Sequence, residues 1–562
     1  MFRTVATSAA ALIAGATTAL ADVTPTQVWE SLSAYYTGYG YDVRTGDTDE
    51  AGDTFTATDI VLTQQAEGGG TTITIPRMTF RATGDANVRA VIEGDMTLES
   101  TYQIPAPDEI DAPAGDGATG EGTPADGGAA PTGPDAGAGT GPADAAPDAQ
   151  ADGPADGGTP PRMITQTVTG TLATPGNELL VSGAPGDMLY RYDYPTLDMQ
   201  LQVPVDDSTT MPVALMLTGA VGSQRVVDGP SPQTTFDMTA DRLEIAATGT
   251  PPADAAAQGT LQFNAALTDL VSSASSVGAS RPDGMAFDLT TQLPEALSAG
   301  LAFDGKLAFG AMEASFDYRG TDESGADQSA AGSARSASTD FAFALDQVGL
   351  AYSASSTDTT AEMTVSSLPF PISYAIEKAS GAIRFPVVAA GEPQDFRVTH
   401  AIAGLTLADG VWDMIDPQNR LPRDPASLTV DLEGKARVNQ SLFDPNFAQG
   451  ASAQMPIVPQ SVTINQVSLD AVGAKADVTG ALTLPEGGAG QPVGTVEGRF
   501  EGLNGLLDAL VAMGLVPPER QAMGRMMLGM FAAPVEGNPD AMTTRIEFRE
   551  DGSVLANGQQ VR

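Results

Sequence analysis

The sequence predicts a mainly β fold: a long antiparallel sheet with a helix near the N-terminus and a helical hairpin near the C-terminus. Segments in which apolar and polar residues alternate recur along most of the chain, as in Thr71–Ile75, Phe341–Leu345 and Leu428–Leu432. This period of two residues is typical of half-buried strands. Turn-forming residues separate the segments at short intervals, and long amphipathic helices are few, which favours an antiparallel, β-dominated architecture.

The N-terminus has the order of a secretory signal peptide. Arg3 precedes an apolar run of small residues that extends to Leu20, and an Ala-x-Ala site ends at Ala21. We therefore expect residues 1–21 to be removed by cleavage between Ala21 and Asp22, and the mature protein to reside in a bacterial periplasm. The run is too short and too weakly apolar for a good membrane span, and no later stretch resembles one, so no integral span is expected.

A helix is expected directly after this leader. Thr24 can cap it, Pro25 suits its first position, and Gln27 completes a capping box. Gly38 can end the helix. Its apolar face is formed by Val28, Leu32, Tyr35 and Tyr36.

One segment differs from the rest in composition. Residues 105–162 consist almost wholly of Ala, Gly, Pro, Asp and Thr, with no aromatic residue. Such a segment cannot bury enough apolar surface to offset its ordering entropy, and we expect it to be disordered. Strand-like sequences flank it, so it reads as a long loop within one β-rich domain made of residues 22–104 and 163–562. A milder case is the segment 321–339, which is rich in Ser, Ala and Gly.

Two Asp-Gly pairs predict turns between strands. Asp304-Gly305 lies between the short apolar segments 301–303 and 307–309, and Asp551-Gly552 lies between strand-like segments near the C-terminus. Asp-Gly flanked by alternating apolar residues is a strong signal for a two-residue turn. We therefore expect a β-hairpin at each pair.

Residues 504–531 predict a helical hairpin. Asn504 can cap the first helix, which ends near Gly514, and Pro517-Pro518 can start the second. The spacing of the apolar residues predicts that one face packs on the sheet as core, although a methionine-rich face could instead be presented to an apolar ligand or partner. The residues concerned are Leu506, Leu507, Leu510, Val511, Met523, Met526, Met527, Met530 and Phe531.

The composition argues against several classes of function. The chain has 27 Lys and Arg against 71 Asp and Glu, a net charge of −44. That charge repels phosphate backbones, so no nucleic-acid partner is expected. There is no Cys and His400 is the single His, so thiol, zinc and iron–sulfur chemistry are not expected. His400 lies in a strand-like run, and no Gly-x-Ser-x-Gly elbow surrounds a serine, which argues against a serine hydrolase.

Two partial motifs fall short of a binding site. Gly300–Lys306 matches the start of a phosphate-binding loop, but Leu307 stands where Ser or Thr would bind Mg²⁺. Asp47–Asp53 begins like a calcium loop, but Ala51 and Thr58 occupy ligand positions. Paired carboxylates are too numerous to single out an acid–base pair. The sequence therefore offers no catalytic, cofactor-binding or metal-binding residue, and we expect no cofactor.

Several motifs resemble one uncharacterised family. They are Trp412–Pro417 with Leu421–Ala426, Leu506–Leu510 with Gly514–Pro517, Ala556–Gln559, and the opening Ala21–Pro25 with Val28-Trp29. In these motifs the sequence is similar to the alphaproteobacterial domain-of-unknown-function family 2125, over the mature chain apart from the insert. The resemblance implies a Gram-negative periplasmic setting, with no known activity and no site residues. Trp412 is expected to be a core anchor on a single helical turn.

Together these observations favour a non-enzymatic periplasmic scaffold that binds an apolar ligand, such as lipid, or another envelope protein. The lipid rests on a fold-level analogy with β-rich lipid-handling envelope proteins and not on a site. A carboxylate-based hydrolase of the envelope is the alternative, and a role in surface assembly is a third. A continuous apolar groove would favour lipid binding, whereas a closed cleft with two buried carboxylates would favour the enzyme.

Overall fold

The computed structural model describes residues 23–562 except positions 39, 67, 106–162, 206–208, 251–257, 284, 286, 290, 323, 445–446, 448–455 and 486–489. Within these residues the chain forms five helices and 27 strands of one sheet. The predicted cleavage site at Ala21 and Asp22 and nearly all of the predicted insert lie outside the described residues. The mainly β, antiparallel architecture expected from the sequence is confirmed.

The strands follow one another along the sheet largely in chain order. The first twelve are β1 (Asp42–Arg44), β2 (Asp47–Ala51), β3 (Thr54–Ala66), β4 (Gly69–Ala82), β5 (Val88–Glu93), β6 (Met96–Pro105), β7 (Met163–Ala173), β8 (Glu178–Ala184), β9 (Asp187–Pro204), β10 (Thr210–Val227), β11 (Gln233–Gly249) and β12 (Gln258–Val277). The next are β13 (Ala302–Phe309), β14 (Met312–Thr321), β15 (Asp327–Ser336), β16 (Ser338–Asp346), β17 (Gly349–Val365), β18 (Ile372–Phe385), β19 (Gln394–Leu407), β20 (Ala426–Val438), β21 (Ile457–Ala471), β22 (Ala474–Thr483), β23 (Val493–Glu501), β24 (Ala533–Val535), β25 (Asn538–Phe548), β26 (Val554–Ala556) and β27 (Gln559–Gln560). The helices are α1 (Pro25–Gly38), α3 (Leu293–Ser298), α4 (Asp409–Ile415), α5 (Leu503–Ala512) and α6 (Pro518–Phe531).

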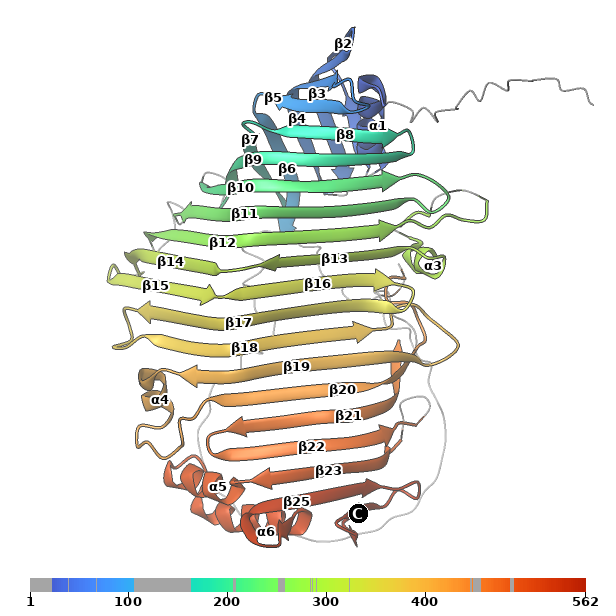
Figure 1. Ribbon diagram of the computed structural model, residues 1–562. Coiled ribbons are helices and arrows are strands. Elements are labelled where there is room, and N and C mark those ends of the chain that lie inside the picture. The colour runs from blue at the N-terminus through green and yellow to red at the C-terminus, as the bar shows by residue number, and fades with distance from the viewer. Residues whose placement is uncertain are drawn as a thin grey trace, which may run out of the picture.

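The sheet is a single meander. Neighbouring strands pair antiparallel, and in places two shorter strands lie end to end against one long neighbour, as β13 and β14 do against β12. The strands are stacked from the α1 end to the end that carries α5 and α6 (Figure 1). β6 and β7 pair with each other up to Pro105 and Met163, so the insert joins two adjacent strands, as the sequence predicts.

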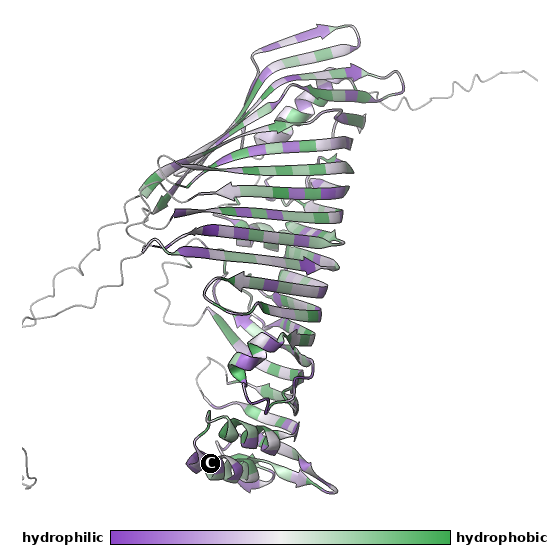
Figure 2. Cartoon of the chain, turned by 90° about the vertical axis from the view of Figure 1, so that its left-hand side faces the viewer, coloured by the Kyte–Doolittle hydropathy of each residue, from purple (hydrophilic) through white to green (hydrophobic). Residues whose placement is uncertain are grey.

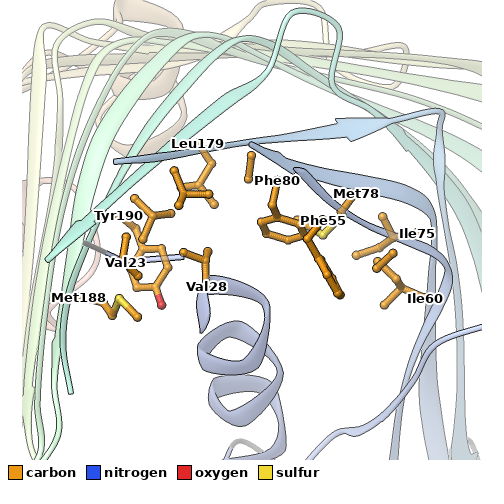
Figure 3. Close-up of a cluster of buried hydrophobic side chains, with 14 of the residues drawn as sticks. Val23, Val28, Phe55, Ile60, Ile75, Met78, Phe80, Leu179, Met188 and Tyr190 are labelled. Atoms are coloured by element: carbon orange, nitrogen blue, oxygen red, sulfur yellow. The ribbon is translucent and has the colours of Figure 1, made fainter. Parts of the chain in front are cut away.

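Helix α1 forms the core of the N-terminal end. The predicted capping box is present: the Thr24 N–H donates to Gln27 Oε1 at 3.0 Å, and the Gln27 N–H donates to Thr24 Oγ1 at 3.2 Å. Val28 is fully buried, and Phe80 and Tyr190 reach toward it from strands on either side of the helix (Figure 3). Burial of one such large apolar side chain stabilises the fold by about 1.5–3 kcal/mol. The helix is thereby anchored on one face of the curved sheet.

Several long strands bend near their middle. Asp269 in β12 and Asp358 in β17 have φ of 54° and 48°, and Gly219 in β10 has φ of 65°. A residue in the left-handed region interrupts the alternation of side chains along a strand. As a result Leu217 and Ala220, three residues apart, contact the same hydrophobic cluster across the bend. The sheet therefore folds toward the face that bears this cluster, and Figure 2 shows the N-terminal strands sweeping out of the stack.

Two expectations about local structure are wrong. Asp304-Gly305 forms no turn, because both residues lie within β13, where Gly305 pairs with Ala274 on one side and Phe343 on the other. Pairing with two neighbours overrides the local preference for a turn. The segment 321–339 is not a loose connection, because Asp327–Ser336 forms β15. Its small residues fit beside large ones of β14: a Cβ at Gly332 would collide with the Phe316 ring.

The C-terminal elements follow the sequence more closely. The Asp551-Gly552 turn lies between β25 and β26, with Gly552 at a φ of 82°. The helical hairpin is present, but α5 begins at Leu503 and Asn504 is not its cap. Gly502 takes that position with a φ of 73°, a conformation that glycine adopts without strain and that turns the chain from β23 directly into the helix.

Candidate apolar binding surface

The register of the strands sorts the side chains onto two faces. Residues paired directly across neighbouring strands point to the same side of a sheet. One row of paired residues runs from β8 to β25. Apart from the phenol groups of its tyrosines, its only strongly polar group is the amide of Gln224. Its members are Val181, Tyr190, Gln224, Phe236, Ala274, Gly305, Phe343, Tyr352, Ile383, Val398, Leu432, Ile464, Gly480, Val496 and Ile546. We call the face that bears this row the apolar face.

The residues next to this row in the same strands form the opposite, polar face. Their row consists of Arg225, Thr235, Ser275, Asp304, Ala344, Ala351, Arg384, Arg397, Glu433, Thr463, Ala481, Thr495 and Glu547. Exposed ion pairs cross the strands here, such as Arg397 with Asp431 at 2.9 Å. Figure 2 shows the alternation of hydrophilic and hydrophobic residues along the strands. The sheet therefore separates apolar from polar side chains over its length.

The apolar face continues on the other side of the strand bends. A second row of paired residues contains no polar side chain: Leu62, Ile73, Leu98, Gly170, Leu201, Val213, Ala247, Phe263, Phe316, Gly332, Met363 and Ile372. Leu217 and Leu267 on this side pack against Ala220 and Leu270 on the other side. The two rows consequently belong to one concave surface.

Between its two ends the apolar face is only partly covered. Tyr352 is 45% exposed, Phe343 42% and Ile383 39%, although all three are large apolar side chains. Glycines at positions such as Gly305 and Gly480 lower the surface between the larger residues. Soluble proteins seldom expose contiguous apolar patches of more than a few hundred Å² without a function for them. We call this partly exposed apolar face of the curved sheet the groove.

At the N-terminal end, α1 lies on the apolar face and a cavity of about 1120 Å³ adjoins it. The helix contributes Glu30 and Tyr35 to this cavity, and the sheet contributes Met188, Val226 and Phe303. Carboxylate and hydroxyl groups thus stand beside apolar ones at this end of the groove.

Four tyrosines gather where α1 meets the groove. Burial raises the pKa of Tyr36, Tyr190, Tyr192 and Tyr194 above the usual value, and the neighbouring phenols add to the effect. For Tyr194 the pKa rises to about 12. The Tyr192 hydroxyl donates to Gln224 Oε1, which satisfies the one amide in the apolar row. The neutral phenols therefore act as apolar surface with internal hydrogen bonds.

At the C-terminal end, α5 and α6 stand over the apolar face and border a cavity of about 660 Å³ that is open to solvent. Its lining is apolar apart from Thr544, whose hydroxyl donates to the Phe531 carbonyl at 2.5 Å. The sheet contributes Phe500 and Ile546, and the helices contribute Leu506, Leu507, Leu510, Met527, Leu528 and Phe531. The cavity continues the line of the groove, because Ile546 is the last member of the long apolar row.

The prediction that the methionine face is core is wrong. Neither α5 nor α6 contains a buried residue. Met527 is 51% exposed although it lines the cavity, and Met523, Met526 and Met530 are about as exposed. The helices lie over the sheet with an open cavity between, so their apolar spacing does not reflect a packed interface.

Among the described residues, the carboxyl groups whose pKa departs from its usual value lie at the surface. In each of them the pKa is lowered. At Asp187, for example, the Arg225 guanidinium donates hydrogen bonds to the carboxylate. A general acid needs a raised pKa. No group of three or more His, Asp or Glu side chains in the described chain could hold a metal ion.

The partial motifs lie in strands. Gly300 precedes β13, and Ala302–Phe309 pairs on both sides, so no phosphate-binding loop forms there. Asp47–Ala51 is the edge strand β2, paired with β3, and not a calcium loop. His400 lies in β19, as expected, opposite Gly381. These placements agree with the sequence expectation that the motifs are coincidental.

Helix α4 anchors a loop at one edge of the sheet. Trp412 is buried, as predicted, and the Arg423 guanidinium lies 5.8 Å from its ring centre. Asp416 is fully buried, and its Oδ2 accepts the N–H groups of Arg420 and Leu421. The loop is thus held by backbone hydrogen bonds to one carboxylate, a structural role for the most buried acidic side chain among the described residues.

Residues 301–558 match a family described as an uncharacterized protein conserved in bacteria (DUF2125). The DUF2125 match includes the α4 loop and the helical hairpin, whose motifs indicated that family, but it begins near β13 and leaves out α1 and the first twelve strands. No curated protein and no solved structure matches the chain. Among the described helices, none is both long and apolar enough to cross a membrane.

Ten of the fifteen residues of the apolar row lie within the DUF2125 match and five lie before it, and sequence reasoning missed the row as a whole. The alternation of single strands was visible, but the row requires the register between strands, which the sequence of one strand does not contain. The sequence signal that could have revealed the row is an aromatic or branched residue followed directly by a small or charged one, repeated from strand to strand, as in Tyr352-Ser353 and Ile383-Arg384.

Proposed function

We propose that this protein is an exported periplasmic scaffold without enzymatic activity, and that it holds lipid acyl chains on its apolar face. The observation that carries the proposal is the apolar row on one side of the sheet, which Gln224 alone interrupts with a strongly polar group. The backbone donors and acceptors of a paired strand are already used within the sheet, so the face offers its occupant contact area and few hydrogen bonds. Hydrocarbon chains need no hydrogen bonds, which makes them suited to such a surface.

The dimensions of the groove support lipid as the occupant. From Tyr190 to Ile546 the apolar row crosses fourteen successive strands. At about 4.8 Å between strands, the row is about 60 Å long. One leaflet of a bilayer has acyl chains about 15 Å deep, half of the hydrocarbon core. The groove is long enough for several acyl chains placed end to end.

Export rests on the leader sequence, which ends in an Ala-x-Ala site before Asp22. A protein without Cys needs no disulfide chemistry in the periplasm, and its −44 charge keeps the polar face hydrated. N-terminal sequencing of protein released from the periplasm should begin at Asp22. Membrane-bound protein that retains Met1 would sink the export part of the proposal.

Lipid binding is tested by native mass spectrometry of protein purified from the periplasm. The groove variant Tyr352→Asp with Ile383→Asp should lose co-purified lipid, because two carboxylates would stand in the apolar row. The matched control is Ser353→Asp with Ala382→Asp, in the same two strands but on the polar face. The control should retain lipid. Equal lipid content in both variants, or none in the wild type, would contradict the proposal.

The alternative of a carboxylate-based hydrolase gains no support from the described residues. Its requirement was a closed cleft with two buried carboxylates, and the buried carboxylate Asp416 instead holds a loop through backbone N–H groups. For lipid binding, the feature expected from the sequence was a continuous apolar groove, and the apolar face supports that function.

A further inference from the structure

We infer that the outer surface of the α5–α6 hairpin docks on a phospholipid bilayer, so that acyl chains enter the groove at this end. The inference rests on the proposed function for what passes into the groove, but docking itself is separately testable. The hairpin lies at the end of the sheet opposite α1 (Figure 1). The two ends differ, because α1 packs into a core of buried side chains, whereas neither helix of the hairpin contains a buried residue.

Helix α6 has two apolar sides. Gly524, Leu528 and Phe531 line the cavity beneath it. Met523, Met526 and Met530 recur at the same helical spacing but are not part of that lining, and they are 57%, 62% and 49% exposed. With Leu515, which is 64% exposed in the connection to α5, these three methionines form what we call the methionine patch.

Polar side chains of the two helices bind each other. Asp508 of α5 accepts hydrogen bonds from Gln521 at 2.6 Å and from Arg525 at 2.5 Å, both in α6. These bonds hold the two helices together on the side away from the methionine patch. Glu519, four residues before Met523, lies on the same side of α6, so the exposed apolar side extends from Met523 to Met530. Exposed apolar side chains of a surface helix can insert into the boundary between headgroups and acyl chains.

The hairpin is locally neutral, although the whole chain is strongly acidic, and this charge distribution favours contact with a bilayer at the hairpin over contact elsewhere on the protein. The whole chain has a net charge of −44, whereas the hairpin, from Leu503 to Phe531, has Asp508 and Glu519 against Arg520 and Arg525, a balance of zero. An anionic membrane surface repels the acidic body of the protein but not this neutral tip. Methionine side chains adapt to irregular apolar surroundings, and the patch requires no specific hydrogen-bond partner.

Flotation with vesicles tests the docking surface. The chain from Asp22 onward is mixed with vesicles of phosphatidylethanolamine and phosphatidylglycerol and centrifuged through a density gradient. The patch variant carries Met523→Glu, Met526→Glu and Met530→Glu. The control variant carries Met216→Glu, Val221→Glu and Val271→Glu, which places the same added charge at exposed apolar residues of the polar face.

We expect wild type and control to float with the vesicles, and the vesicle-bound fraction of the patch variant to fall about tenfold or more, since interfacial binding scales with buried apolar area. Thermal melts near that of the wild type show that each variant is folded. In addition, Met526→Trp should show a blue-shifted emission when vesicles are added, a readout that does not depend on loss of binding.

Two results would overturn the inference. One is that the wild type stays in the dense fraction or that the patch variant floats like the control. The other is that neither protein binds vesicles, while the wild type is a dimer in solution and the patch variant is a monomer. That result would mean that a second copy of the chain covers the patch. The groove variant Tyr352→Asp with Ile383→Asp separates the two proposals: it should still float while retaining no lipid. Flotation by a wild type that never holds lipid would leave docking in place and remove the proposed function.

Discussion

Truncating Met527 to alanine distinguishes a hairpin over a cavity from a hairpin packed as core. Full burial of a methionine side chain is worth about 1.5–3 kcal/mol. Met527 is 51% exposed, so about half of that contribution is present, and Met527→Ala should lower the free energy of unfolding by about 1 kcal/mol. Phe80→Ala provides the comparison, because Phe80 is fully buried in the α1 core and its truncation should cost about 3–5 kcal/mol.

Equilibrium urea unfolding of both variants gives the two values, provided that the slopes of the transitions match the wild type. A loss of 2–5 kcal/mol for Met527→Ala, in the range of buried methionines, would refute the reasoning. It would mean that α5 and α6 close onto Phe500 and Ile546 in solution, that the 660 Å³ cavity is not present, and that the methionine spacing does describe core.

Four further outcomes are expected. Replacing residues 108–160 with a short Gly/Ser loop should leave the thermal midpoint within a few degrees, since β6 and β7 pair up to the ends of the insert; a large fall in calorimetry would show that the segment packs on the fold. Asp416→Ala should cost about 1–3 kcal/mol in urea unfolding, because the Arg420 and Leu421 N–H groups lose their acceptor, and Asp416→Asn should cost less. Burial raises the pKa of Tyr194 to about 12. The neutral phenol therefore stabilises the fold below the unfolded pKa of about 10, and this contribution disappears as the pH rises to 12. In pH-dependent melts Tyr194→Phe should lose less stability than the wild type between about pH 10 and 12, and an identical profile would be inconsistent with a buried phenol. Neither ATP nor EDTA should shift the thermal midpoint, because the partial phosphate and calcium motifs both lie in paired strands, and a shift of several degrees with either would show a site there.

Local signals in the sequence predicted the elements whose stabilising contacts are also local. The capping box at Thr24 and Gln27, the end of α1 at Gly38 and the Asp551-Gly552 turn all depend on residues a few positions apart. Trp412 was predicted as an anchor because a large aromatic residue on a short helical turn has few other ways to be buried. For these elements, side chain and backbone preferences agree with the fold.

The remaining features depend on contacts between distant residues. Asp304-Gly305 has the local signature of a turn, but β12 and β16 supply backbone partners on both sides, and their hydrogen bonds outweigh the local preference. The bends at Asp269 and Asp358 reverse which residues face the groove, and a non-glycine residue at positive φ has no reliable sequence signal. The apolar groove could not be predicted for the same reason, since it depends on these bends and on the register of many strands.

The meander also determines how the molecule can change length. Each strand contacts mainly its neighbours in the chain, so a β-hairpin added within the stack would lengthen the sheet by two strand spacings, about 10 Å, without disturbing distant strands. A single residue inserted in the middle of β17 would have the opposite effect, because it turns every later side chain of that strand to the other face. Ala361, Met363 and Val365 would exchange surroundings with Thr360, Glu362 and Thr364. The length of the sheet is therefore adjustable only in whole hairpins.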